Sequence, residues 1–160
     1  MNVGNVLAKF SCSVLFAARH MQIPAGMENP ACSRLWLIPP VKRLQSCARV
    51  SEVVTDFCQW GADWLKPTRL LGVCLDLERV SRRCRFRTQG FLCSRTGCRH
   101  LQLVGTPEQG KFWTEVAESY PSRFAGALDA AYNDAMCQKT AASFEYLLKR
   151  LVAMASRTLA

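Results

Sequence analysis

The chain has 160 residues, of which 49% are hydrophobic and 21% are charged, and this composition excludes collagen-like, low-complexity and strongly disordered proteins. Lysine and arginine together number 21 against 12 acidic residues, and the net charge of +9 favours acidic partners such as nucleic acid or an anionic membrane. Of these, we expect DNA to be the partner. No apolar run approaches the roughly 18 residues that a spanning helix needs, which excludes a transmembrane protein, and we expect no membrane partner. The length fits one domain, and we expect a single α/β domain over residues 1–160.

The cysteines indicate whether the protein resides in a reducing or an oxidising cellular compartment. There are nine of them, an odd number that cannot pair completely within one chain, and their spacing resembles no small disulfide scaffold. We interpret most of them as small buried hydrophobic residues of an intracellular, reducing compartment, either nuclear or cytoplasmic. An organelle transit peptide is the alternative, because Lys9 and Arg19 are present while no acidic residue precedes Glu28.

The first part of the chain predicts a helix and then shorter elements. Apolar residues recur with helical spacing from Val3 to Arg19. Residues 27–30 read Met-Glu-Asn-Pro, a short element that ends in a turn. The run Leu35–Ile38 is closed by two prolines, the second of which can begin a helix. A strand is expected over Glu52–Cys58, which is rich in β-branched residues.

The second part predicts two strands and two helices around an insert. The strand Thr68–Cys74 is almost wholly apolar, as a strand buried on both faces would be. Residues 79–100 lack apolar periodicity and form a basic, cysteine-rich excursion from the core. A short strand at Leu101–Val104 precedes helices over Pro121–Met136 and Ala142–Leu159. We therefore expect a small three-layer or partial Rossmann-like sheet that ends in two helices.

Aromatic and basic residues gather just before the strand Thr68–Cys74. Trp60 and Trp64 stand close to Lys66 and Arg69. Aromatic rings beside cations at a strand entrance suit base stacking and phosphate pairing, so Trp60, Lys66 and Arg69 are candidate DNA-binding residues. The alternative is that both tryptophans close the end of a core.

The excursion contains a dense cluster of positive charge. Seven arginines lie between Glu78 and Glu108, with no acidic residue among them. Arginine pairs with phosphate oxygens through two parallel hydrogen bonds, so this cluster predicts nucleic-acid binding. The alternative is a solvated surface loop. The seven residues are Arg79, Arg82, Arg83, Arg85, Arg87, Arg95 and Arg99, and all but Arg79 are candidate contacts.

Potential zinc ligands lie within the same excursion. Cys84, Cys93, Cys98 and His100 supply three thiols and an imidazole, enough for a tetrahedral zinc ion. A metal would fold a loop that otherwise lacks support. The spacing C-x8-C-x4-C-x-H does not contain the C-x2-C pair of well-defined zinc motifs, so buried or incidental cysteines are the alternative.

Two of these segments together resemble the later half of the DNA cytosine-5 methyltransferase catalytic domain. Met27-Glu28-Asn29-Pro30 is similar to the family's Glu-Asn motif at a strand end. Phe57-Cys58-Gln59-Trp60-Gly61, followed by Lys66, Thr68 and Arg69, is similar to its Tyr-Cys-x-aromatic-Gly segment and basic strand. The resemblance extends over about Ile23–Ala130, and Leu65 departs from it, because a basic residue is usual there.

The resemblance implies roles for several residues. Glu28 would contact and activate the target cytosine, Lys66 and Arg69 would hold DNA or the flipped base, and the excursion would replace the target-recognition insert. The family's Pro-Cys nucleophile and its glycine-rich S-adenosylmethionine loop are not found before Glu28. The chain would then be a C-terminal portion that does not methylate DNA alone, and it would bind S-adenosylmethionine only within a full-length parent. For Glu28 itself, a solvated turn residue is the alternative.

The sequence leaves three hypotheses open, of which we favour the first. The first is a methyltransferase-derived fragment that at most binds DNA and self-associates through an exposed sheet edge. The second is a small basic nucleic-acid-binding module, stabilised by zinc. The third is an interaction protein or a relic without a selected activity.

Overall fold

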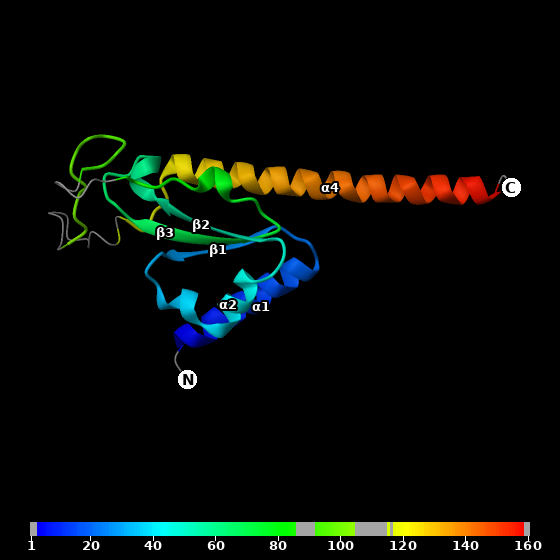
Figure 1. Cartoon of the computed structure of the whole chain (residues 1–160), viewed down its shortest axis with the longest axis horizontal. Coiled ribbons are helices and arrows are strands. Elements are labelled where there is room, and N and C mark those ends of the chain that lie inside the picture. The colour runs from blue at the N-terminus through cyan, green and yellow to red at the C-terminus, as the bar shows by residue number, and fades with distance from the viewer. Residues whose placement is uncertain (1–2, 86–91, 105–114, 116, 159–160) are drawn as a thin grey trace.

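A three-stranded antiparallel sheet lies at the centre of the protein (Figure 1). The structure is a computed structural model that describes residues 3–85, 92–104, 115 and 117–158. The strands are β1 (Ala25–Pro30), β2 (Val50–Asp56) and β3 (Pro67–Val73), in the order β1-β3-β2. The expected apolar strand is thus the central one, paired antiparallel with both neighbours and buried on both faces.

The expectation of a Rossmann-like sheet, whose strands run parallel, is wrong, because both strand pairs are antiparallel. Parallel neighbours need a crossover of a dozen or more residues, usually a helix, whereas antiparallel neighbours can be joined directly. Residues 57–66 connect β2 to β3 and contain only the short 3-10 helix η2 (Phe57–Trp60). This connection reverses the chain at one end of the sheet, so β3 runs against β2.

Helices cover both faces of the sheet and give three layers (Figure 1). On one face, α1 (Val3–His20), η1 (Arg34–Leu37) and α2 (Pro39–Gln45) pack against Leu71 and Val73 of β3. On the other face, α4 (Ser122–Thr158) and η3 (Glu78–Val80) share a core with Leu70. Alternate side chains of a strand point to opposite faces, so one apolar strand serves two cores.

The C-terminal region forms one continuous helix where two were expected. Residues 137–141 read Cys-Gln-Lys-Thr-Ala, and no proline or glycine is present there to end a helix. Phe124 and Ala131 near the start of α4 are buried against the sheet, whereas Phe144 and Tyr146 are exposed. Figure 1 shows the later part of α4 extending beyond the sheet.

The strand expected at Leu101–Val104 does not form. Leu101 makes a single parallel bridge to Trp64, and its N–H donates to the carbonyl of Asp63 at 2.8 Å. This segment therefore joins the connection between η2 and β3, not the sheet. Its attachment brings the end of the cysteine-rich excursion next to η2.

Candidate metal centre

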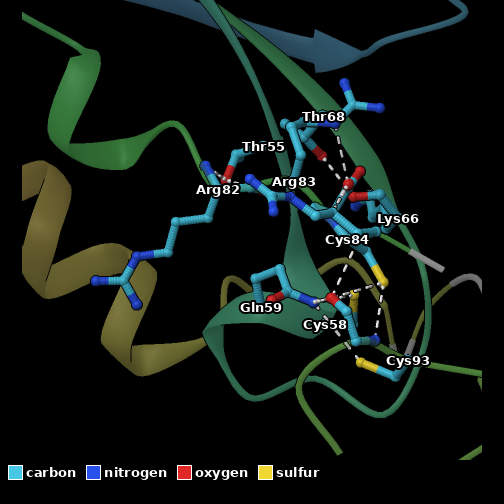
Figure 2. Close-up of polar contacts among 12 residues, drawn as sticks. Thr55, Cys58, Gln59, Lys66, Thr68, Arg82, Arg83, Cys84 and Cys93 are labelled. Atoms are coloured by element: carbon cyan, nitrogen blue, oxygen red, sulfur yellow. Dashed lines mark hydrogen bonds and ion pairs between the residues drawn. The ribbon is translucent and has the colours of Figure 1, made fainter. Parts of the chain in front are cut away.

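Three cysteines and one histidine converge beside η2. Their ligand atoms, three sulfurs and one imidazole nitrogen, all lie within 4.8 Å of one another. The cysteines are buried and the histidine is half-buried. Figure 2 shows the three cysteine sulfurs pointing toward a common centre. A Cys3His set is one of the ligand sets of structural zinc sites, so this cluster can hold a metal ion. The four residues are Cys58, Cys84, Cys93 and His100.

The cluster differs from the sequence-based set at one position. It contains Cys84, Cys93 and His100 as expected, but its fourth member is Cys58 and not Cys98. Cys98 is exposed, and its sulfur contacts the carbonyl of Thr96 at 3.7 Å. The sequence signal for Cys58 was its place in the Phe-Cys-Gln-Trp-Gly segment, but nothing in the spacing linked that segment to the excursion.

A tight turn explains why Cys98 faces away from the cluster. The N–H of Cys93 donates to the carbonyl of Cys98, and the N–H of Gly97 donates to the carbonyl of Cys93, both at 2.8 Å. Gly97 has a φ of 70°, in the left-handed region that glycine adopts without a steric penalty. The turn therefore fixes the backbone between Cys93 and His100 and leaves Cys98 at its exposed end.

η2 holds Cys58 against the core. Phe57 and Trp60 on either side of it are buried in the core under α4. Gly61, with a φ of 114°, ends the short helix, and its N–H donates to the carbonyl of Cys58 at 3.4 Å. Gln59 reaches across the cluster, since its side-chain nitrogen lies 3.5 Å from the sulfur of Cys58 and 3.7 Å from that of Cys93.

Cys84 is held by neighbours from two other segments. Its sulfur lies 3.6 Å from Nε2 of His100 and accepts the N–H of Ser94 at 3.5 Å. Its own N–H donates to Oδ2 of Asp56 at 2.6 Å. The thiol therefore points to the imidazole while its backbone is tied to the end of β2.

The pKa values of the Cys58 and Cys93 thiols are shifted in opposite directions. Burial raises the pKa of Cys58 to about 12, helped by the adjacent Cys84 and Cys93 and opposed by the hydrogen bond from Gln59. Burial also acts to raise the pKa of Cys93. Hydrogen bonds from the backbone of the turn that follows, together with those from nearby side chains, outweigh it, and the pKa of Cys93 falls to about 6. A bound dication would stabilise the thiolate form of every cysteine ligand.

Several arginines of the excursion are engaged within the protein. Arg82 stacks on the ring of Trp60, 3.8 Å from its centroid, and Arg83 Nε lies 3.1 Å from Oδ2 of Asp56. Arg79 pairs with an aspartate of α4. Arg95 donates to the carbonyl of Cys58, so it ties the segment between Cys93 and His100 to η2. These guanidinium groups hold the excursion against the core.

All six described arginines of the excursion are exposed, and two of them lie directly beside ligand residues of the cluster. Arg85 follows Cys84 directly, and Arg99 precedes His100 directly. Within the described ranges, neither guanidinium has an ion pair or a side-chain hydrogen bond. Arg87 lies outside the described residues. Arg85 and Arg99 are therefore the strongest candidates for contacts with a partner.

The candidate DNA-binding residues at the start of β3 and just before it have partners within the protein. Trp60 is only 3% exposed and donates through Nε1 to the hydroxyl of Thr55 at 2.7 Å, so it is a core residue, as the alternative interpretation held. Lys66 donates to the carbonyl of Ala117 at 2.8 Å. Arg69 pairs with Glu52 at 3.2 Å and lies over the ring of Trp36.

Glu28 lies in β1 and is not a member of the cysteine cluster. Its Oε2 accepts a hydrogen bond from the hydroxyl of Tyr120 at 3.0 Å. Burial, together with the Glu28 carboxylate, raises the pKa of Tyr120 to about 12. This contact joins β1 to the segment before α4.

Comparisons with protein-family models, with curated proteins and with solved structures found no match to this chain. Among the residues described, no helix combines the length and the apolar character needed to cross a membrane.

Proposed function

We propose that this protein is a basic nucleic-acid-binding domain whose arginine-rich excursion is folded by a structural zinc ion. The observation that carries the proposal is the Cys3His cluster, because it joins η2 of the core to both ends of that excursion. The ligands are Cys58, Cys84, Cys93 and His100.

Zinc suits the cluster for two reasons. Three thiolates and an imidazole complete a tetrahedral shell, which is typical of structural zinc and leaves no position for a substrate. The excursion also has little core of its own. In its described parts, residues 79–85 and 92–100, the buried residues are the two ligands Cys84 and Cys93 and Val80, which belongs to the core under α4. Such a loop buries too little apolar surface to offset its conformational entropy, so metal binding would supply the folding free energy.

The charge around the zinc site supports nucleic acid as the partner. The chain carries a net charge of +9, and seven arginines lie between residues 79 and 99. Arg85 and Arg99 are exposed and adjoin two of the zinc ligands. A metal that fixes Cys84 and His100 would also fix the backbone from which these two guanidinium groups reach phosphate oxygens.

The resemblance to cytosine-5 methyltransferases does not carry this proposal. That resemblance implies a strand ending at Glu28-Asn29, and β1 does end at Pro30. Its pairing with β3 is antiparallel, however, and the Glu28 carboxylate accepts a hydrogen bond from Tyr120 within the protein. Methyl transfer to DNA by the purified chain would contradict the inactive fragment that the resemblance implies. DNA binding no better than that of an unrelated protein of equal charge would favour the interaction-protein or relic hypothesis.

The proposal is tested by measuring zinc content and DNA affinity on the same purified protein. We expect one zinc per chain, and we expect chelation of the metal under reducing conditions to weaken DNA binding. Affinity should fall steeply with salt, because each phosphate contact contributes about 0.9 to the slope of log affinity against log salt. The proposal fails if the chain carries no zinc when grown with it, or if its affinity is unchanged by chelation.

A charge-matched pair of variants tests the surface. The variant Arg85→Ala/Arg99→Ala should lower the salt slope by about 0.9 for each phosphate that is no longer bound. The control Arg34→Ala/Lys42→Ala removes two exposed cations from the α2 side of the sheet and should keep the slope. Equal slopes for the two variants would show that only total charge matters.

A further inference from the structure

Asp56 is a buried carboxylate between the sheet and the metal cluster. It is the last residue of β2 and only 1% exposed. Its Oδ2 accepts the N–H of Cys84 at 2.6 Å and lies 3.1 Å from Nε of Arg83. We propose that Asp56 is a positioning residue of the metal centre that holds Cys84 in place for coordination. The inference rests on the proposed zinc site.

Two hydrogen bonds from one residue join the two segments that carry ligands. The side chain of Asp56 holds the N–H of Cys84, and the backbone N–H of Asp56 donates to the carbonyl of Arg82 at 2.8 Å. Asp56 also stands two residues before Cys58 in the chain. Asp56 therefore fixes the position of Cys84 relative to Cys58. In other metal sites, hydrogen bonds from residues that do not touch the metal orient its ligands in the same way.

A buried carboxylate that only stabilises the core should have hydrogen-bond partners for both of its oxygens, and within the described part of the chain Asp56 has them for one. Its other oxygen, Oδ1, is buried and has no partner among the described residues. Burying a carboxylate with an unpaired oxygen is unfavourable, and the side chain of Arg83 that offsets its charge is 56% exposed. The group is thus poorly suited to stabilising the core, but it is well placed to fix a ligand.

Arg83 receives a different role from the one that the sequence predicted. Its Nε is directed at Asp56, so its charge compensates a buried carboxylate inside the protein. Figure 2 shows Arg83 beside Cys84 at the end of the sheet. Removal of Arg83 should therefore affect the metal centre more than it affects the salt dependence of DNA binding.

The test compares cobalt binding by three variants in the full chain. Cobalt reports tetrahedral thiolate coordination through its ligand-field and charge-transfer absorption bands. Asp56→Ala removes the acceptor for Cys84 and should weaken metal affinity about 10- to 100-fold, with reduced thiolate-to-cobalt absorption. Asp56→Asn keeps an acceptor oxygen and should restore most of the affinity and the wild-type spectrum. Asp76→Ala is the matched control, since Asp76 caps the N–H of Glu78 in the same way at an exposed turn.

The outcomes separate this inference from the proposed function. If the wild-type chain binds neither cobalt nor zinc, the proposed site and this inference fail together. If the wild type binds and Asp56→Ala matches it in affinity and spectrum, only the positioning role is overturned. Should Asp56→Ala not fold, amide hydrogen exchange of the metal-loaded wild type decides, because protection of the Cys84 N–H supports the bond to Asp56 and rapid exchange overturns it.

Discussion

The two cysteines on which sequence and structure disagree give the sharpest prediction. Cys58 is fully buried, and its sulfur lies within 4.8 Å of the other three ligand atoms. Cys98 is exposed and outside that set. Replacing either by serine exchanges one sulfur for an oxygen and changes little else. We expect Cys58→Ser to impair zinc binding strongly and Cys98→Ser to leave it unchanged.

The size of the effect follows from the number of ligands. Structural zinc binds zinc-finger peptides with about 10–16 kcal/mol, so an equal share for one ligand of four is about 2.5–4 kcal/mol. That reduction corresponds to a weakening of roughly 10²- to 10³-fold. An exposed substitution away from any such site changes stability by about 0.5 kcal/mol at most, and this is the expectation for Cys98→Ser.

Competition with a chromophoric chelator under reducing conditions measures both affinities. The wild type and Cys98→Ser should hold zinc equally well, and Cys58→Ser should release it at a far lower chelator concentration. Circular dichroism of each metal-free variant controls for a general loss of fold. Zinc binding that is abolished in Cys98→Ser but retained in Cys58→Ser would refute the prediction, because the ligand set would then be the one expected from sequence spacing.

Further predictions concern the core and pH. Phe124→Ala empties a fully buried position under the sheet and should lower the free energy of unfolding by about 3–5 kcal/mol in a denaturant titration. Gly72→Ala would bring a methyl group within 2.9 Å of a carbon of Leu77, and the same titration should show a destabilisation of about 1–3 kcal/mol from overpacking. The pKa of Tyr120 is raised in the folded state, so the unfolded chain ionises first, and stability should decline as pH rises from about 10 toward 12. Tyr120→Phe should make that decline shallower, and an unchanged pH profile would contradict the assignment.

Elements with a local signature could be predicted from the sequence. The helical spacing from Val3 predicts α1, and the apolar run at Thr68–Cys74 predicts the buried strand β3. Strand direction depends on which strands become neighbours, and the short connection through η2 sets it in the folded chain. The two helices expected over Pro121–Met136 and Ala142–Leu159 are one helix, α4, because residues 137–141 contain no proline or glycine that would end it.

The site could be predicted only where its residues are close in sequence. Cys84, Cys93 and His100 share one segment, so their number and chemistry suggested a metal. Cys58 joins them through the packing of η2, and Cys98 is turned away at Gly97, and neither fact has a signature in spacing. The same holds for charge, since the sequence shows how many arginines there are but not that Arg83 faces the buried Asp56.

X-ray absorption at the zinc edge of the purified chain tests the proposed metal centre most directly. We predict a bound zinc ion with three sulfur ligands at about 2.3 Å and one nitrogen ligand at about 2.0 Å. A shell of two sulfurs or fewer, or protein prepared with zinc that contains none, would contradict the Cys58, Cys84, Cys93 and His100 centre.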